Sequence, residues 1–158
     1  MGLISDHKVF HGGTYNTNPV AMAAGIATFR EVLTRDAYTH VTKLNKKLVE
    51  GYNRELKSSG LQAYVVSAGA NGALMFFEKP IQNYRDWLKA DTELWRHYWF
   101  AMVNRGVMAQ PYWWDEQWTI SVQHTDADID QHLAAFADLA PALARVQQES
   151  PEPVAAAH

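Results

Sequence analysis

The residues best suited to chemistry lie in a glycine-threonine turn near the start of the chain. Gly12, Gly13 and Thr14 come shortly before Asn18-Pro19 and an apolar run rich in alanine. Glycine lets the main chain approach a ligand closely, and the Thr14 hydroxyl is a hydrogen-bond donor. Asn18 is a favourable helix N-cap, and proline suits the first helical position. The segment predicts either an ordinary turn before a helix or a loop that binds a phosphate.

Acidic and histidine side chains form a second group of candidates. Asp115 and Glu116 lie in a tryptophan-rich loop, and Glu116, which precedes a predicted strand, is the better candidate for acid–base chemistry. His7 and His11 are four residues apart, but they flank an extended segment and no third ligand is close in sequence, so we expect no metal site. There is no cysteine nucleophile, no Gly-x-Ser-x-Gly and no strand-linked dinucleotide-binding glycine pattern.

Helices and short strands are expected to position these residues. Apolar periodicity, capping residues and turn residues predict helices over residues 19–33, 35–58 and 91–104, a last helix that begins after Thr125, and strands over 62–68, 73–78, 107–110 and 118–122. We read the first two strands as an antiparallel pair, although their loop also fits non-neighbouring strands, and the last two as a second pair. The order predicts an α+β fold, a small antiparallel sheet covered by helices on one side.

The first predicted helix has apolar side chains around most of its circumference. Val20, Met22, Ile26 and Phe29 do not share one face. A helix of this kind must be buried on more than one side. In a chain of 158 residues, this implies a partner subunit or a missing domain.

Composition narrows the class of protein. The chain has 14 basic and 17 acidic residues, a formal charge of −3 and no cysteine, so nothing favours nucleic acid or an anionic membrane as partner, and disulfides are excluded. No signal peptide or membrane-spanning stretch is recognisable, so we expect a cytoplasmic protein. All six tryptophans lie in the second half of the chain, where we expect them in a dense core and an interface.

Two blocks of the sequence resemble class III aminotransferases of the glutamate-1-semialdehyde aminomutase type. Residues 9–28, VFHGGTYNTNPVAMAAGIAT, resemble the segment that follows the cofactor lysine of that family. Residues 107–111, Glu116 and residues 118–130 are similar to the family's closing strand, its serine and histidine, and its last helix. The resemblance covers nearly the whole chain and is weaker from about residue 43 to 99. It implies the C-terminal half of a fold-type-I enzyme dependent on pyridoxal phosphate (PLP).

The resemblance also implies roles for individual residues. In the family the Gly-Thr turn, here Gly13 and Thr14, contacts the PLP phosphate across a subunit interface. The family's glutamate before the final strand lies near the active site and matches Glu116. Trp113 and Trp114 occupy a loop that shapes the substrate pocket in relatives. These residues are the expected cofactor-binding and substrate-pocket positions.

Other parts of the family pattern lie upstream of the Gly-Thr turn and are not found in this sequence. They are the lysine that attaches PLP, the aspartate on the pyridine nitrogen, the aromatic residue over the ring and the main phosphate loop. Lys8 is the nearest lysine and a weak substitute, because an exposed lysine is mostly protonated and a poor nucleophile. We therefore expect PLP to be held weakly or without a covalent bond.

Two hypotheses follow. In the first, the chain is a half-length PLP-dependent aminotransferase-like protein, a homodimer or higher oligomer, that transfers an amino group between an amine or amino acid and a keto acid or aldehyde. In the second, it is a non-catalytic dimerisation or binding subunit, or a fragment, that completes a separate N-terminal half. The missing lysine favours the second, and the presence of Thr14 and Glu116 favours the first.

The same comparison divides the chain into three expected segments. Residues 1–18 would be the end of a large-domain-like segment that carries the Gly-Thr turn. Residues 19–148 would form a connecting helix and a small C-terminal domain, and residues 149–158 a disordered tail.

Overall fold

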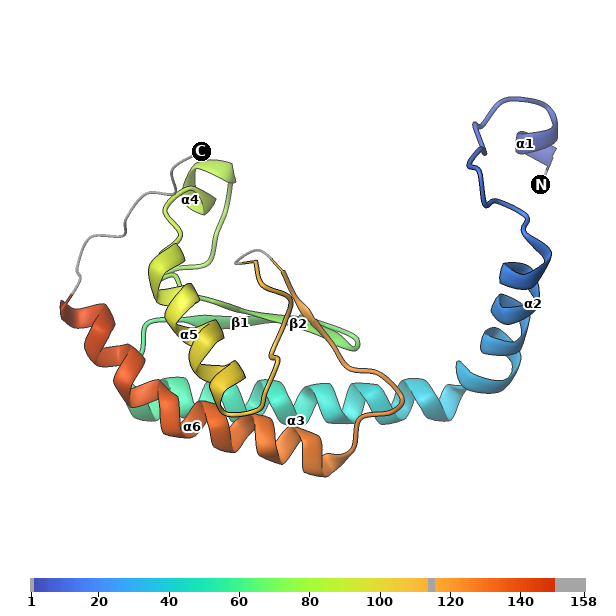
Figure 1. Cartoon of the computed structure of the whole chain (residues 1–158). Helices are drawn as coiled ribbons and strands as arrows, with labels where there is room; N and C mark the ends of the chain where they lie inside the picture. Colours follow the sequence, from blue (N-terminus) through green and yellow to red (C-terminus); the bar gives the residue numbers. More distant parts are fainter. Residues whose placement is uncertain (1, 114–115, 150–158) are drawn as a thin grey trace. The chain divides into compact units, whose positions relative to one another are not determined.

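The computed structural model describes residues 2–113 and 116–149. The chain divides into two units, Met1–Ala37 and Tyr38–His158, which we describe separately. Trp114, one of the expected pocket residues, and most of the expected C-terminal tail lie outside the described residues. In chain order (Figure 1) the elements are α1 (Gly2–Ser5), α2 (Pro19–Ala27), the π-helical turn η1 (Thr28–Val32), α3 (Arg35–Ser59), β1 (Tyr64–Ala68), β2 (Asn71–Met75), α4 (Tyr84–Trp87), α5 (Thr92–Asn104), β3 (Trp118–Thr119) and α6 (Asp126–Glu149).

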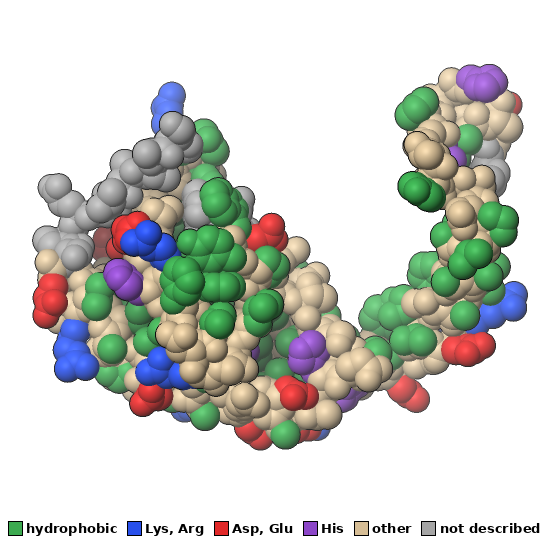
Figure 2. Space-filling view, in the orientation of Figure 1, with side chains coloured by type: hydrophobic (Ala, Val, Ile, Leu, Met, Phe, Trp, Pro, Cys, Tyr) green, Lys and Arg blue, Asp and Glu red, His purple; other side chains and the backbone are tan. Residues whose placement is uncertain are grey.

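The first unit is built around α2 and the turn that precedes it. Asn18 caps this helix as the sequence predicts, because its Oδ1 accepts hydrogen bonds from the N–H groups of Val20 and Ala21 at 3.0 and 3.2 Å. No residue of α2 or η1 is buried. Figure 2 shows hydrophobic side chains along the surface of this segment. Within its own unit, α2 therefore lacks the packing that an apolar helix needs.

The second unit holds the hydrophobic core. The long helix α3 supplies a stripe of buried residues at helical spacing, Val41, Leu44, Leu48, Tyr52 and Leu56. Figure 1 shows α3 and α6 side by side beneath the sheet, and α5 packs against α6. Ile129, Leu133 and Phe136 of α6 are buried in the same core. The predicted α+β fold, with a small antiparallel sheet and covering helices, is confirmed.

The sheet has three strands in the order β1-β2-β3, and both pairs are antiparallel. Tyr64 pairs with Met75 and Ala68 with Asn71 across a tight turn in which Gly69 has a φ of +60°. The prediction that the first two strands form an antiparallel pair is therefore confirmed.

The predicted second strand pair is wrong. Residues 107–110 form no strand, and β3 pairs with β2 instead. The backbone of this segment is already engaged by α5, because the Val107 N–H donates to the Met102 carbonyl at 3.0 Å and the Gln110 carbonyl accepts from Trp99 Nε1 at 2.8 Å. These two bonds hold both ends of the segment against the helix and away from a strand ladder.

One buried amide joins α3 to the sheet. Asn45 is 2% exposed, and its Nδ2 donates to Ser67 Oγ and the Gly69 carbonyl at 2.9 Å and to the Asn71 carbonyl at 3.1 Å. Its Oδ1 accepts from Trp118 Nε1 at 2.8 Å. Every hydrogen-bonding atom of this side chain is thus paired, which removes the cost of burying it.

The remaining connections follow local signals in the sequence. The last helix begins with a capping box, in which the Thr125 N–H donates to Asp128 Oδ2 at 2.7 Å and the Asp128 N–H to Thr125 Oγ1 at 3.4 Å. The short helix α4 is capped by Asn83, whose side chain accepts from the N–H groups of Arg85 and Asp86. Among the described residues, no helix is long and apolar enough to cross a membrane.

Replacing Gly72 of β2 by alanine tests the packing of Trp118 on the sheet. An added Cβ would lie 2.3 Å from Trp118 Cζ2, and the indole cannot retreat without breaking its bond to Asn45. We expect the free energy of unfolding to fall by about 1–3 kcal/mol, the usual cost of overpacking, as measured by urea denaturation. Gly25→Ala in α2 is the matched control, because nothing lies within 4 Å of its added Cβ, and it should not destabilise the protein. Equal stability of the two variants would contradict this packing.

Candidate functional site

The Gly-Thr turn of the first unit is exposed and rich in unpaired donors. Gly13 has a φ of +156°, and its carbonyl accepts the Asn16 N–H at 3.0 Å. A Cβ on Gly13 would lie 3.1 Å from Asn16 Oδ1, so glycine is favoured there by both conformation and space. Among the described residues, the N–H groups of Gly13, Thr14 and Tyr15 have no hydrogen-bond partner. The turn therefore presents several donors to a ligand.

The N-terminus of α2 adds little to this set of donors. Asn18 already accepts from the first two N–H groups of the helix, and Pro19 has none to offer. An anion at this end of the first unit would be bound by the turn itself, through its N–H groups and the Thr14 hydroxyl.

Lys8, the weak candidate for covalent chemistry, lies on the surface of the same unit. Its Nζ is 3.8 Å from Asp6 Oδ2, and its side chain is 68% exposed. Burial can make a lysine nucleophilic, but this ammonium group is exposed to solvent.

Two of the expected pocket residues lie together in the second unit. The Glu116 N–H donates to the Trp113 carbonyl at 3.1 Å, which closes the loop that contains both residues. Gln110 Nε2 donates to the Glu116 carbonyl at 3.0 Å. Glu116 is exposed, and Trp113 is 56% exposed. The structure thus places Trp113 and Glu116 on one surface loop, while Gly13 and Thr14 belong to the first unit.

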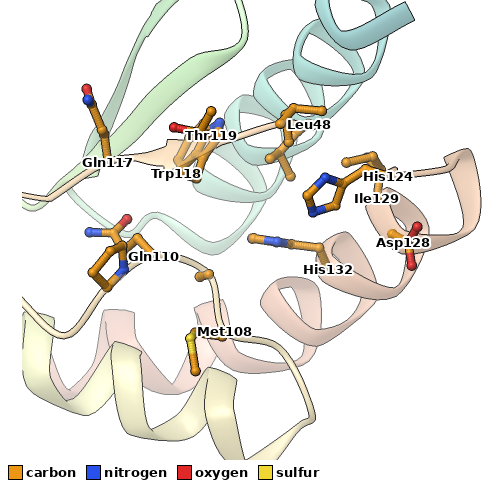
Figure 3. A pocket seen from close by; sticks show the side chains of 13 residues that line it. Leu48, Met108, Gln110, Gln117, Trp118, Thr119, His124, Asp128, Ile129 and His132 are labelled. Carbon is orange, nitrogen blue, oxygen red and sulfur yellow. The ribbon is translucent and has the colours of Figure 1, made fainter. Parts of the chain in front are cut away.

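A pocket of about 290 Å³ lies beside this loop (Figure 3). Its walls come from α3 through Leu48, from the segment after α5, from β3 and from the start of α6. Trp113 and Glu116 are not among the residues that line it. Gln110, Trp118, His124 and His132 are, and none of these four was chosen from the sequence as a site residue.

A chain of buried hydroxyl groups reaches this pocket through His132. Tyr52 Oη is 2.7 Å from Tyr98 Oη and 2.6 Å from His132 Nε2. Both tyrosines are fully buried, and burial raises the pKa of each phenol above its usual value. Burial, with a smaller contribution from the charge of His124, lowers the pKa of His132 to about 4. The three groups are therefore neutral together near pH 7.

The spacing of His132 in the sequence indicates that it faces the core, although a polar residue is usually expected at the surface. His132 comes three residues after Ile129 and four before Phe136, so it lies along the apolar stripe of α6. From its polarity alone, it would be placed at the surface or rim. Its contact with Tyr52 across 80 residues of chain is a tertiary feature that local spacing does not reveal.

Solved structures similar to this chain include aminomutases and transaminases. A crystal structure of a glutamate-1-semialdehyde aminomutase from Pseudomonas aeruginosa PAO1 has a TM-score of 0.75 and 27% identity, covering 85% of this chain and 30% of that protein. An omega-transaminase from Sphaerobacter thermophilus, at 23% identity, shares the fold with a TM-score of 0.69, covering 87% of this chain and 31% of its own. The fold is thus similar to part of the fold-type-I aminotransferase fold.

The similarity to curated sequences indicates the type of enzyme more narrowly than the fold does. A glutamate-1-semialdehyde 2,1-aminomutase from Desulfatibacillum aliphaticivorans is 33% identical over 127 residues, which cover 80% of this chain and 30% of that enzyme. The resemblance to this type of aminotransferase, expected from the two sequence blocks, is confirmed. The chain spans about 30% of the length of the curated relatives it matches, which is consistent with the expected C-terminal part. No protein-family model matches the chain.

The partly buried imidazole of His132 makes the free energy of unfolding depend on pH. The unfolded chain binds a proton on His132 below about pH 6.5, whereas the folded chain does so only near pH 4. The contribution of His132 to the free energy of unfolding is therefore complete above pH 6.5 and is lost as the pH falls from 6.5 to about 4. The shift corresponds to about 3 kcal/mol at most. Urea denaturation between pH 7 and 4 should show this loss, and His132→Gln should flatten it, while the exposed His97→Gln should keep the wild-type slope. A wild-type slope in His132→Gln would contradict this assignment.

Proposed function

We propose that this chain is part of a PLP-dependent aminotransferase-like enzyme, which moves an amino group between an amine or amino acid and a keto acid or aldehyde. The observation that carries the proposal is the exposed Gly13-Thr14 turn with its unpaired N–H donors, in a chain similar to glutamate-1-semialdehyde aminomutases. Because the chain spans about 30% of those relatives, the rest of the active site, including the lysine, would come from outside these residues.

The residues of the turn fit one part of the cofactor, its phosphate. The N–H groups of Gly13, Thr14 and Tyr15 and the Thr14 hydroxyl are the donors that a phosphate requires. Residues 9–20 contain no acidic side chain that would repel it. When bound, PLP supplies the electron sink for amino-group exchange. In the proposed arrangement, Gly13 and Thr14 hold the phosphate across a subunit interface.

The loop of the second unit would contribute to the substrate side. We assign Trp113, Trp114 and Glu116 to the substrate pocket, as the resemblance implies. The Glu116 carboxylate is suited to pairing with an amino group or holding a proton, and indole faces exclude water. In this proposal, residues 1–18 belong to the large-domain side of the site. Residues 19–148 form the connecting helix and the small domain.

A second copy of the chain is the partner that we propose for the first unit. Val20 and Phe29 are 78% and 74% exposed, and Met22 and Ile26 are about half exposed. This apolar surface surrounds α2 and η1 directly after the Gly-Thr turn. Covering it would bury the helix and bring the turn to an interface.

The phosphate contact of Thr14 can be tested without activity. We expect Thr14→Val to weaken PLP binding about tenfold or more, because a hydrogen bond to a charged group contributes roughly 1.5–3 kcal/mol. Equilibrium dialysis measures this, since it needs no covalent bond. Pyridoxal, which lacks the phosphate, should bind more weakly than PLP and equally to both proteins. Thr42→Val, at an exposed position of α3, is the control. Unchanged PLP affinity in Thr14→Val would contradict the assignment of the turn to the PLP phosphate.

The oligomeric state tests the proposed partner. We expect the wild-type chain to sediment as a dimer or larger assembly, and Phe29→Glu to shift it toward monomer by placing a charge in the apolar surface of η1. Val66→Glu adds the same charge at an exposed apolar position of β1 and should leave the assembly intact. If the wild-type chain is a monomer and associates only with a separately produced half that bears the lysine, the partner is that half and not a second copy. A monomer that binds neither would refute both partners.

A further inference from the structure

One buried side chain connects the loop that carries Trp113 and Glu116 to the core of the second unit. Gln110 is 3% exposed, and its Nε2 donates to the Glu116 carbonyl at 3.0 Å. Because a carbonyl only accepts, the NH₂ group of the Gln110 amide must be the one that faces Glu116. The backbone carbonyl of Gln110 accepts in turn from Trp99 Nε1 of α5 at 2.8 Å. Glu116 is therefore tied through Gln110 to α5.

Aromatic contacts hold the start of the same loop. The ring centroid of Tyr112 lies 4.8 to 5.6 Å from those of three aromatic residues of α5, Trp95, Trp99 and Phe100. Ring pairs at such distances are favourable beyond the area that they bury. Trp95 is 5% exposed and belongs to the hydrophobic core, so the contacts reach from the loop into the core. The chain is thus anchored to α5 immediately before Trp113.

Backbone hydrogen bonds close the loop between these two anchors. The Trp113 N–H donates to the Pro111 carbonyl at 2.7 Å, and the Glu116 N–H donates to the Trp113 carbonyl at 3.1 Å. The side chains of Trp113 and Glu116 are nevertheless exposed, as contact with a ligand requires. The loop thus combines a backbone that is fixed from α5 with exposed side chains that can contact a ligand.

We propose that Gln110 is a positioning residue for the substrate side of the site. A buried amide costs free energy that an apolar side chain of the same size avoids, but only the amide can bind the Glu116 carbonyl. This bond fixes the backbone from which the Glu116 carboxylate projects beside Trp113, so that the carboxylate can pair with the amino group of a substrate. The inference rests on the proposed function for the role of Glu116.

Backbone ¹⁵N relaxation of the intact chain tests the positioning without assuming that role. In the wild type we expect the Glu116 amide to have an NMR order parameter near that of a rigid backbone, about 0.85. Gln110→Met keeps most of the side-chain volume and removes the donor, so the order parameter of Glu116 should fall below about 0.6. The amides of Leu48 and Leu133 in the core should keep their wild-type values. A Glu116 value below about 0.6 in the wild type, an unchanged value in Gln110→Met, or an equal loss in the core would overturn the proposal.

Gln147→Met is the matched control, because Gln147 of α6 also holds a backbone through its amide. Its Oε1 accepts the Gln62 N–H at 2.8 Å, and its Nε2 donates to the Gln62 carbonyl at 2.9 Å. This variant should lower the order parameter of Gln62 and leave that of Glu116 unchanged. Loss of order at Glu116 in Gln147→Met would show general loosening and refute the proposal. If Gln110→Met fails to fold, Trp99→Phe, which removes the donor to the Gln110 carbonyl and keeps an aromatic ring, takes its place under the same criteria.

Titrations with two probes separate this proposal from the proposed function. Benzylamine carries an amino group that Glu116 should bind, and benzyl alcohol is its uncharged counterpart. We expect the wild type to bind benzylamine more tightly, with NMR shifts centred on Glu116, and Gln110→Met to weaken this binding about threefold or more. Binding that is lost in Glu116→Gln and unchanged in Gln110→Met would refute the positioning and support the role of Glu116. Equal binding of the two probes to the wild type would contradict the role of Glu116, and the order parameters would still decide the positioning.

Discussion

The buried amide of Asn45 is the contact on which the second unit depends. It links α3 to Ser67 of β1, to the β1–β2 turn, to Asn71 of β2 and to Trp118 of β3. An apolar residue at this position would remove the acceptor of the Trp118 N–H and the donor to the Gly69 and Asn71 carbonyls. Because the indole is fixed at its nitrogen, its ring lies 5.4 Å from that of Tyr52 in a near-parallel stack. The position of β3, and with it one wall of the pocket, follows from this amide.

The sequence predicted the helices well because their signals are local. The apolar stripe of α3, the Asn18 cap and the Thr125–Asp128 capping box are all readable within a few residues. The strand pairing was only half predictable. The β1–β2 turn lies between its strands, whereas the bond from Trp99 to the Gln110 carbonyl, which diverts residues 107–110 from the sheet, depends on tertiary packing.

The residues of the candidate site were likewise predictable only where their signal is local in the sequence. Thr14 and Glu116 were named because they lie in contiguous sequence motifs that resemble those of aminomutases, and their roles stay predictions. Gln110 and His132 were missed because a polar residue in sequence looks like a surface residue. Their positions depend on partners elsewhere in the chain, Glu116 and Tyr52, and only the fold brings these together.

The proposed function makes the first unit a link between assembly and cofactor binding. Its helix α2 has nine residues and buries none of them, and isolated helices shorter than about 12–15 residues are marginal in water. In the proposed assembly, its order would come largely from the partner that covers Val20, Ile26 and Phe29. The Gly13-Thr14 turn leads directly into that helix, so a partner that orders α2 also fixes the donors of the turn. A phosphate bound there would in turn favour the assembled state, since a ligand stabilises the form that binds it. On this argument the Gly-Thr turn and the apolar helix are one functional element.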